Sequence, residues 1–99
     1  MRVVLSPRAK RELIRIVDWW KDKTGAQPAF LFAELKEAAR LLGELPHQGD
    51  RFATVRGRVV FRLLLREAQV HVYYRVDDDA VRVLTIWSTA RGREPRLGT

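Results

Sequence analysis

The first third of the chain begins with a short apolar run and continues at helical spacing. Residues Arg2 to Leu5 are mostly β-branched, which predicts a first strand. Ser6 followed by Pro7 is a typical helix start, and apolar residues then recur on one helical face as far as about Lys23. Gly25 is expected to cap the end of this helix. The apolar stripe comprises Ala9, Leu13, Ile16, Val17 and Trp20.

A second helix is predicted from Pro28 onward, and Pro46 and Gly49 are expected to close it. Its buried stripe comprises Leu31, Leu35, Ala38, Leu42 and Leu45, widened by Phe32 and Ala39. Because only a few residues separate the two helices, we expect them to pack as an antiparallel hairpin.

From Phe52 onward the pattern changes to β-branched and aromatic runs. Strands are predicted over 59–66, 70–76 and 81–87, with residues 52–55 as a candidate for a further short piece. The connections are short, so these strands should form an antiparallel meander, and the tail after Arg91 should be irregular. The order β-α-α-β-β-β predicts an α+β fold, in which an antiparallel sheet is backed by the N-terminal two-helix hairpin.

A length of 99 residues predicts a single domain over residues 1–99. The chain has no cysteine, which excludes disulfides, thiol catalysis and cysteine-type zinc sites. No apolar run approaches the roughly 20 residues that span a bilayer, and no signal-peptide pattern is present. We therefore expect a soluble cytoplasmic protein with no membrane partner.

The chain is strongly basic, with 19 Lys and Arg against 12 Asp and Glu and a net charge of +7. Fifteen of the 19 cations are Arg, whose planar fork of donors fits phosphates and carboxylates. This excess favours an anionic partner: RNA, DNA or an acidic protein segment. The alternative is a GC-rich genome that uses Arg for ordinary solvated positions.

Three groups of residues follow the order and spacing of a known family. The first is Val4-Leu5-Ser6-Pro7-Arg8-Ala9 with Leu13, Ile16 and Trp19-Trp20, the second is Gly25, Ala29, Phe32, Leu42, Pro46 and Gly49, and the third is Val72-Tyr73-Tyr74-Arg75-Val76 with Val83-Leu84-Thr85-Ile86-Trp87 and Arg91. Over residues 2 to about 95 the chain therefore resembles the RelE/ParE superfamily, the toxins of bacterial type II toxin–antitoxin systems.

The resemblance implies a small sheet backed by a helical hairpin, a growth-inhibiting activity, and a cognate antitoxin as partner. RelE-like members of this superfamily cut mRNA in the ribosome, whereas ParE-like members poison DNA gyrase. No cofactor and no metal are expected, since three adjacent acids at 77–79 in a hairpin turn seldom converge on one ion.

A metal-independent endoribonuclease needs a general base, a general acid and cations for the phosphorane charge. The resemblance places Arg62, His71 and Arg91 at positions for such chemistry. His71, Tyr73 and Arg75 alternate along one strand and are expected to share a polar face. Arg62, Tyr73, Arg75 and Arg91 are also the candidates for binding the target. His71 could equally be a solvent-facing strand residue, and Tyr73 a half-buried aromatic.

The chain departs from the nuclease pattern at Ser88, where many relatives carry His after Trp87, and no Tyr or His follows it. An unperturbed serine hydroxyl is a poor acid or base near pH 7. We therefore favour the ParE-like, non-enzymatic branch with DNA gyrase as target. The alternatives are a ribosome-dependent mRNA endonuclease that uses Arg62, His71 and Arg91, and a basic nucleic-acid-binding module without toxicity.

Trp19 and Arg15 are the candidates for antitoxin binding. Trp19 lies off the apolar stripe, so it is either an exposed anchor for a partner or packed on the second helix. Arg15 shares a helical face with Arg8 and Arg11, which is either a phosphate-binding stripe or a solvated face. Acidic residues of the antitoxin are expected to meet the arginine-rich face of the sheet.

Overall fold

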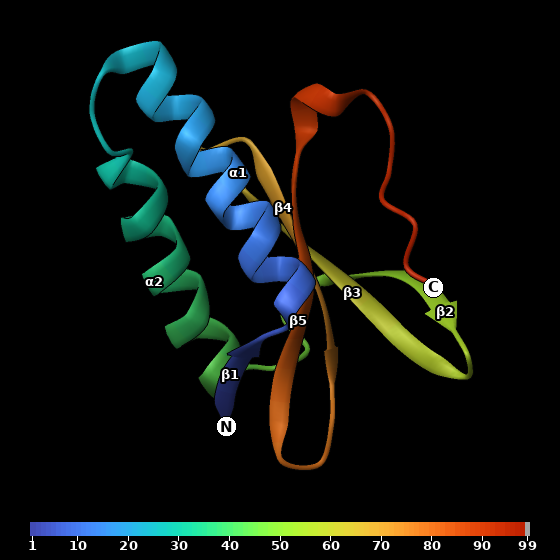
Figure 1. Cartoon of the computed structure of the whole chain (residues 1–99). Helices are drawn as coiled ribbons and strands as arrows, with labels where there is room; N and C mark the ends of the chain where they lie inside the picture. The colour runs from blue at the N-terminus through green and yellow to red at the C-terminus, as the bar shows by residue number, and fades with distance from the viewer. Residues whose placement is uncertain (99) are drawn as a thin grey trace.

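A computed structural model describes residues 1–98 as two helices and a five-stranded sheet (Figure 1). The elements are β1 (Arg2–Leu5), α1 (Pro7–Thr24), α2 (Ala29–Glu44), β2 (Asp50–Val55), β3 (Arg58–Leu65), β4 (Val70–Val76), β5 (Ala80–Ser88) and the 3-10 turn η1 (Thr89–Arg91). The predicted α+β fold with an N-terminal helical hairpin is confirmed. No helix within residues 1–98 is long and apolar enough to cross a membrane.

The strands lie in the order β1-β5-β4-β3-β2. Strands β2 to β5 form an antiparallel meander, in which β2 is a full edge strand rather than a short piece. The expected sheet was antiparallel throughout, but β1 pairs with β5 in parallel, from Arg2 opposite Ala80 to Leu5 opposite Val83. A parallel pair needs a long crossover between its strands, and the helical hairpin together with the meander provides it.

The ends of α1 follow the sequence prediction. The Ser6 hydroxyl accepts a hydrogen bond from the N–H of Ala9 at 3.0 Å, and Gly25 caps the far end with φ +75°. The end of α2 differs from the prediction, because the helix finishes at Glu44. Leu45 was therefore wrongly assigned to the buried stripe: it follows the helix and is 53% exposed. Phe32, which was expected to widen that stripe, is also exposed.

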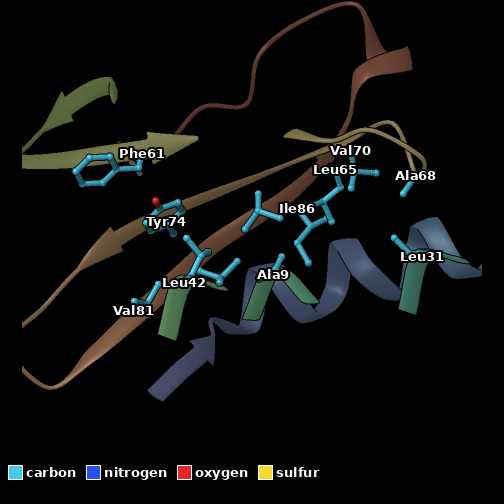
Figure 2. Packing of buried hydrophobic residues seen from close by; sticks show 13 residues of the cluster. Ala9, Leu31, Leu42, Phe61, Leu65, Ala68, Val70, Tyr74, Val81 and Ile86 are labelled. Carbon is cyan, nitrogen blue, oxygen red and sulfur yellow. The ribbon is translucent and has the colours of Figure 1, made fainter. Parts of the chain in front are cut away.

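The main core lies between the helices and one face of the sheet (Figure 2). Ala9 from α1 and Leu31 and Leu42 from α2 pack against the sheet residues Tyr74 and Ile86. All five are buried, so the hairpin shields these positions of the sheet from solvent.

The opposite face of the sheet, here called the outer face, carries a second and smaller apolar cluster. Val60, Tyr73 and Trp87 form its buried centre. From residues 92–98, the side chain of Leu97 packs against this cluster. Figure 1 shows this segment, drawn in red, leaving η1 and running back to end near β2. We call residues 92–98 the C-terminal strap; it has no regular structure, as predicted for the tail.

Candidate functional site

The outer face was expected to be polar along β4, and this was wrong at its centre. Tyr73 is 1% exposed, because Phe52 packs edge-to-face on its ring at 4.9 Å and the cluster around Leu97 covers it. The alternation of His71, Tyr73 and Arg75 is present. However, the buried ring of Tyr73 is not a surface for stacking or proton transfer. The polar groups of this face therefore gather at its two ends.

At the end near the β4–β5 hairpin, three arginines converge on Asp77. Arg58, Arg75 and Arg82 come from three neighbouring strands, and their guanidinium nitrogens lie 2.8, 3.2 and 2.6 Å from the Asp77 carboxylate. The Asp77 side chain is only 15% exposed. Asp77 and Asp79 of this turn are thus paired with arginines. No group of three or more His, Asp or Glu in residues 1–98 is arranged to hold a metal ion. Arg75, a predicted target-binding residue, is committed to this ion-pair network.

At the opposite end, Arg62 and His71 lie on the adjacent strands β3 and β4. The guanidinium of Arg62 pairs with Glu94 of the strap at 3.2 Å and lies 5.0 Å from the centre of the Phe52 ring. Burial lowers the pKa of His71, and the positive charge of Arg62 lowers it further, whereas Glu94 opposes the shift. His71 is therefore an uncharged imidazole at neutral pH.

The indole of Trp87 is approached by three arginines at this same end of the sheet. The Arg91 guanidinium lies 3.8 Å from the ring centre, while Arg93 and Arg8 lie 5.5 and 5.8 Å away. Arg91 also pairs with Glu12 of α1 at 3.2 Å, and both of these side chains are largely buried. Arg91 is thus held between an aromatic ring and a carboxylate, which fixes the position of η1.

Ser88, the residue that departs from the nuclease pattern, has a structural task. Its hydroxyl accepts a hydrogen bond from the N–H of Ala90 at 3.2 Å and so caps the 3-10 turn η1. This use of the hydroxyl is a local backbone cap of the kind that serine commonly makes. The Ser88 hydroxyl makes this hydrogen bond without the help of a neighbouring acid or base.

A groove of about 390 Å³ lies beside α1, away from the outer face cluster. Its lining combines α1 with the end of the β3–β4 hairpin and with η1. Trp19 is 52% exposed there and packs edge-to-face on Trp20 at 4.9 Å. Trp20, not Trp19, packs on α2, through Phe30 at 5.0 Å. The alternative that Trp19 packs on the second helix was therefore wrong. Arg15, with an exposed side chain, and Arg91 also line the groove.

The structure brings some of the predicted residues together and separates others. Arg62 and His71 are neighbours, and Arg91 lies on Trp87, the cross-strand partner of His71. No hydrogen bond or ion pair among the described residues joins any two of these three predicted catalytic side chains. Trp19 and Arg15 line one groove, as expected of a shared surface.

Sequence reasoning missed the carboxylates that hold the predicted arginines. Glu12 binds Arg91 and Glu94 binds Arg62, but nothing in the spacing of these residues marks them as partners. It also missed the strap as a covering segment. The available signal was the pair of apolar residues, Pro95 and Leu97, within an otherwise basic tail. In the structure Pro95 is buried and Leu97 is partly buried.

Comparisons with known proteins give one family match and one match of the fold. A family model described as the ParE toxin of the type II toxin–antitoxin system parDE matches residues 3–92. A solved structure described as the chromosomal ParDE TA system from P. aeruginosa matches with a TM-score of 0.72 and 23% identity, over 89% of this chain and 95% of that chain. At this identity the likeness shows the fold. A search of curated proteins gave no significant match.

Proposed function

The chain belongs to the family of ParE toxins of type II toxin–antitoxin systems, and from this membership we propose that it inhibits growth by acting on DNA gyrase in the cytoplasm. The observation that carries the proposal is the set of contacts made by the residues that a nuclease would need. Arg62 and Arg91 are each paired with a carboxylate, at 3.2 Å in both cases, and Ser88 serves as a backbone cap.

Catalysis of RNA cleavage requires cations that are free to meet the phosphate and a group that donates a proton to the leaving oxygen. In this chain Glu94 and Glu12 each pair with one terminal nitrogen, of Arg62 and of Arg91 respectively. His71 is neutral at pH 7, because burial and Arg62 lower its pKa, so it is poorly suited to act as an acid. These features support the branch of the superfamily that inhibits a protein target.

The groove beside Trp19 is the place proposed for the cognate antitoxin. Its floor is apolar, with Ile16, Trp20 and Val70 among its lining residues, and Arg15 and Arg91 supply positive charge. An antitoxin segment that fits this surface carries a bulky apolar residue for the groove and an acidic residue for Arg15. Exposed Trp and Arg side chains beside a concave surface are typical of the residues that dominate binding energy.

Expression of the chain alone and together with its antitoxin tests the proposal. We expect growth to stop without the antitoxin and to recover with it. Purified toxin should inhibit supercoiling by DNA gyrase, while a cell-free translation reaction given the same amount of toxin continues. Cleavage of mRNA in that reaction, with supercoiling unaffected, would show that the ribosome is the target and overturn the proposal.

A further inference from the structure

The side of α1 that faces away from the sheet is exposed and carries an ordered set of charged and apolar groups (Figure 1). Six exposed side chains line one shallow depression on this side, which we call the α1 ridge: Arg11, Ile14, Arg15, Asp18, Trp19 and Asp22. Spacings of three and four residues place all six on one side of the helix, opposite the buried Ala9. Ile14 and Trp19 are 61% and 52% exposed, so the ridge presents two large apolar groups among its charges.

The charges of the α1 ridge have almost no partners within the chain. Arg15 lies 3.9 Å from Glu12, at the limit of an ion pair. Arg11, Asp18 and Asp22 are exposed and make no ion pair within residues 1–98. Asp22 lies in the last turn of α1, where the helix dipole disfavours a carboxylate. The order of these charges therefore does not stabilise the helix by itself.

The pattern of charges is symmetric about the point midway between residues 16 and 17. Arg11 and Asp22 lie equally far from this point along the chain, and so do Arg15 and Asp18. A two-fold axis at this point would pack a second copy of α1 antiparallel on the first. Arg11 would then face Asp22 of the second copy, and Arg15 would face Asp18 of the second copy. The axis repeats both pairs, whereas a parallel arrangement would set like charges against each other.

The two apolar side chains flank the line of charges, with Ile14 on one side and Trp19 on the other. A two-fold axis keeps each residue on the same side as its equivalent in the second copy, so Ile14 packs beside Ile14 and Trp19 beside Trp19. These contacts bury the large apolar side chains that α1 exposes. The contact uses one helix from each copy, which is less than the roughly 1,600 Å² of a standard interface, so the association should be weak.

From this symmetry we propose that the α1 ridge is a homodimer interface, on which a second copy of this chain packs antiparallel about a two-fold axis. The basic half of the ridge fits the acidic half of another copy presented in reverse order, which makes the surface complementary to itself. Trp19 and Arg15 also line the groove proposed for the antitoxin, so a second copy and the antitoxin would compete for the same side chains. The proposal rests neither on that groove nor on gyrase as the target.

Sedimentation equilibrium of the purified full chain tests the self-association. The salt concentration is about 0.15 M, where a Debye length of about 8 Å screens the repulsion between two net positive copies. We expect a monomer–dimer equilibrium with a Kd between about 10 µM and 1 mM, as suits a small contact. A chain that stays monomeric at about 1 mM would contradict the proposal.

Charge reversal at one pair tests the antiparallel register. Arg15→Asp and Asp18→Arg should each raise the Kd at least about tenfold, because the two-fold axis repeats the clash between like charges. The two changes combined in one chain recreate an opposite-charge pair and should restore the parent Kd. Arg51→Asp is the control, since it makes the same change of charge at an exposed position of β2. Ile14→Gln should also weaken the dimer, although Ile14 does not line the groove beside Trp19.

A mixture of two double variants tests the interface independently of overall charge. Arg11→Asp/Arg15→Asp makes the ridge wholly acidic, and Asp18→Arg/Asp22→Arg makes it wholly basic. Each substitution changes the net charge of +7 by two, so both variants stay net positive and have no general attraction for each other. Each variant alone should be monomeric, and an equimolar mixture should form a heterodimer.

Three further results would overturn the proposal: equal weakening by Arg15→Asp and Arg51→Asp, no recovery in Arg15→Asp/Asp18→Arg, or no association in the mixture of double variants. None of these measurements contains gyrase, RNA or an antitoxin. A negative result therefore leaves the supercoiling test of the proposed function unaffected.

Discussion

The Tyr74 hydroxyl accepts a hydrogen bond from the backbone N–H of Gly49 at 2.8 Å, which ties the loop after α2 to the middle of the sheet. Gly49 stands where no larger residue fits, because an added Cβ would lie 2.7 Å from that hydroxyl oxygen and 3.0 Å from the carbonyl oxygen of Arg62. Burial raises the pKa of Tyr74, although the hydrogen bond from Gly49 opposes the shift. The hydroxyl therefore stays protonated to a higher pH than that of an exposed tyrosine.

Gly49→Ala should lower the free energy of unfolding by about 1–3 kcal/mol, since the new methyl group overlaps the Tyr74 hydroxyl. Urea denaturation measures the loss. The matched experiment repeats the substitution in a Tyr74→Phe background, where the nearest clashing atom is gone and the cost of the alanine should be smaller. Identical costs in the two backgrounds would mean that the hydroxyl is not what excludes a side chain at position 49.

Asp77→Asn should destabilise the protein by about 2 kcal/mol, because it leaves three guanidinium groups at one place without the carboxylate that they share. Asp78→Asn is the control, since Asp78 is exposed and makes no ion pair among the described residues. It should stay within about 0.5 kcal/mol of the parent. Chemical denaturation at the same ionic strength measures the free energy of unfolding of the two variants. Equal losses in the two variants would contradict a special role for Asp77.

Trp19→Ala should weaken the complex with the antitoxin by about 2 kcal/mol or more, because the exposed indole is the largest apolar group at the mouth of the groove. Isothermal titration calorimetry gives the dissociation constant. Leu45→Ala removes a similarly exposed apolar side chain at the far end of the helical hairpin and should change nothing. An unchanged dissociation constant for Trp19→Ala would place the antitoxin elsewhere on the surface.

His71 should titrate below the usual histidine pKa of about 6.5 in an NMR experiment, because burial and Arg62 both disfavour its protonated form. Arg62→Gln should raise the pKa, whereas Glu94→Gln should lower it further. The unfolded chain takes up this proton at a higher pH than the folded chain does. The free energy of unfolding should therefore fall as the pH drops through about 6.5 toward the folded pKa. If Arg62→Gln leaves the midpoint of the His71 titration unchanged, burial alone lowers the pKa of His71.

His71→Ala should leave the toxin active in cells, with supercoiling impaired and mRNA uncut, because no proton transfer is expected to depend on this ring. If the protein were instead a nuclease, the same change should reduce the cleavage rate by roughly 10² to 10⁴. Growth arrest and reporter mRNA integrity, followed in one culture, separate the two outcomes. Loss of toxicity in a variant that folds normally would contradict the proposed branch.

Local patterns predicted the elements well, because helix caps and apolar periodicity act over a few residues. Ser6 and Gly25 cap α1 as the sequence indicated, and the runs after residue 58 are strands. Contacts between distant segments could not be predicted in this way. The alternation of β4 showed which side chains share the outer face, but it could not show that a segment more than 15 residues later covers Tyr73.

The same limit applied to the candidate site. Glu12 and Arg91 are far apart in the sequence, as are Arg62 and Glu94, and each pair meets only in the folded protein. Arg62 and Arg91 therefore looked like free cations in the sequence, whereas the structure gives each a carboxylate partner. Trp19 was the easier case, because its place on the helix relative to the apolar stripe already separates it from Trp20.

The parallel pairing of β1 with β5 also has a consequence for synthesis. Residues 2–5 are made long before their partners, residues 80–83. Until then the edge of β5 does not exist, and α1 lacks the strand whose main chain bonds Ser6 at its start. Contacts between such distant segments slow folding, because the long loop must close before they form. A nascent chain of this protein therefore cannot complete its sheet until β5 has been made. Until that point the toxin is not yet folded.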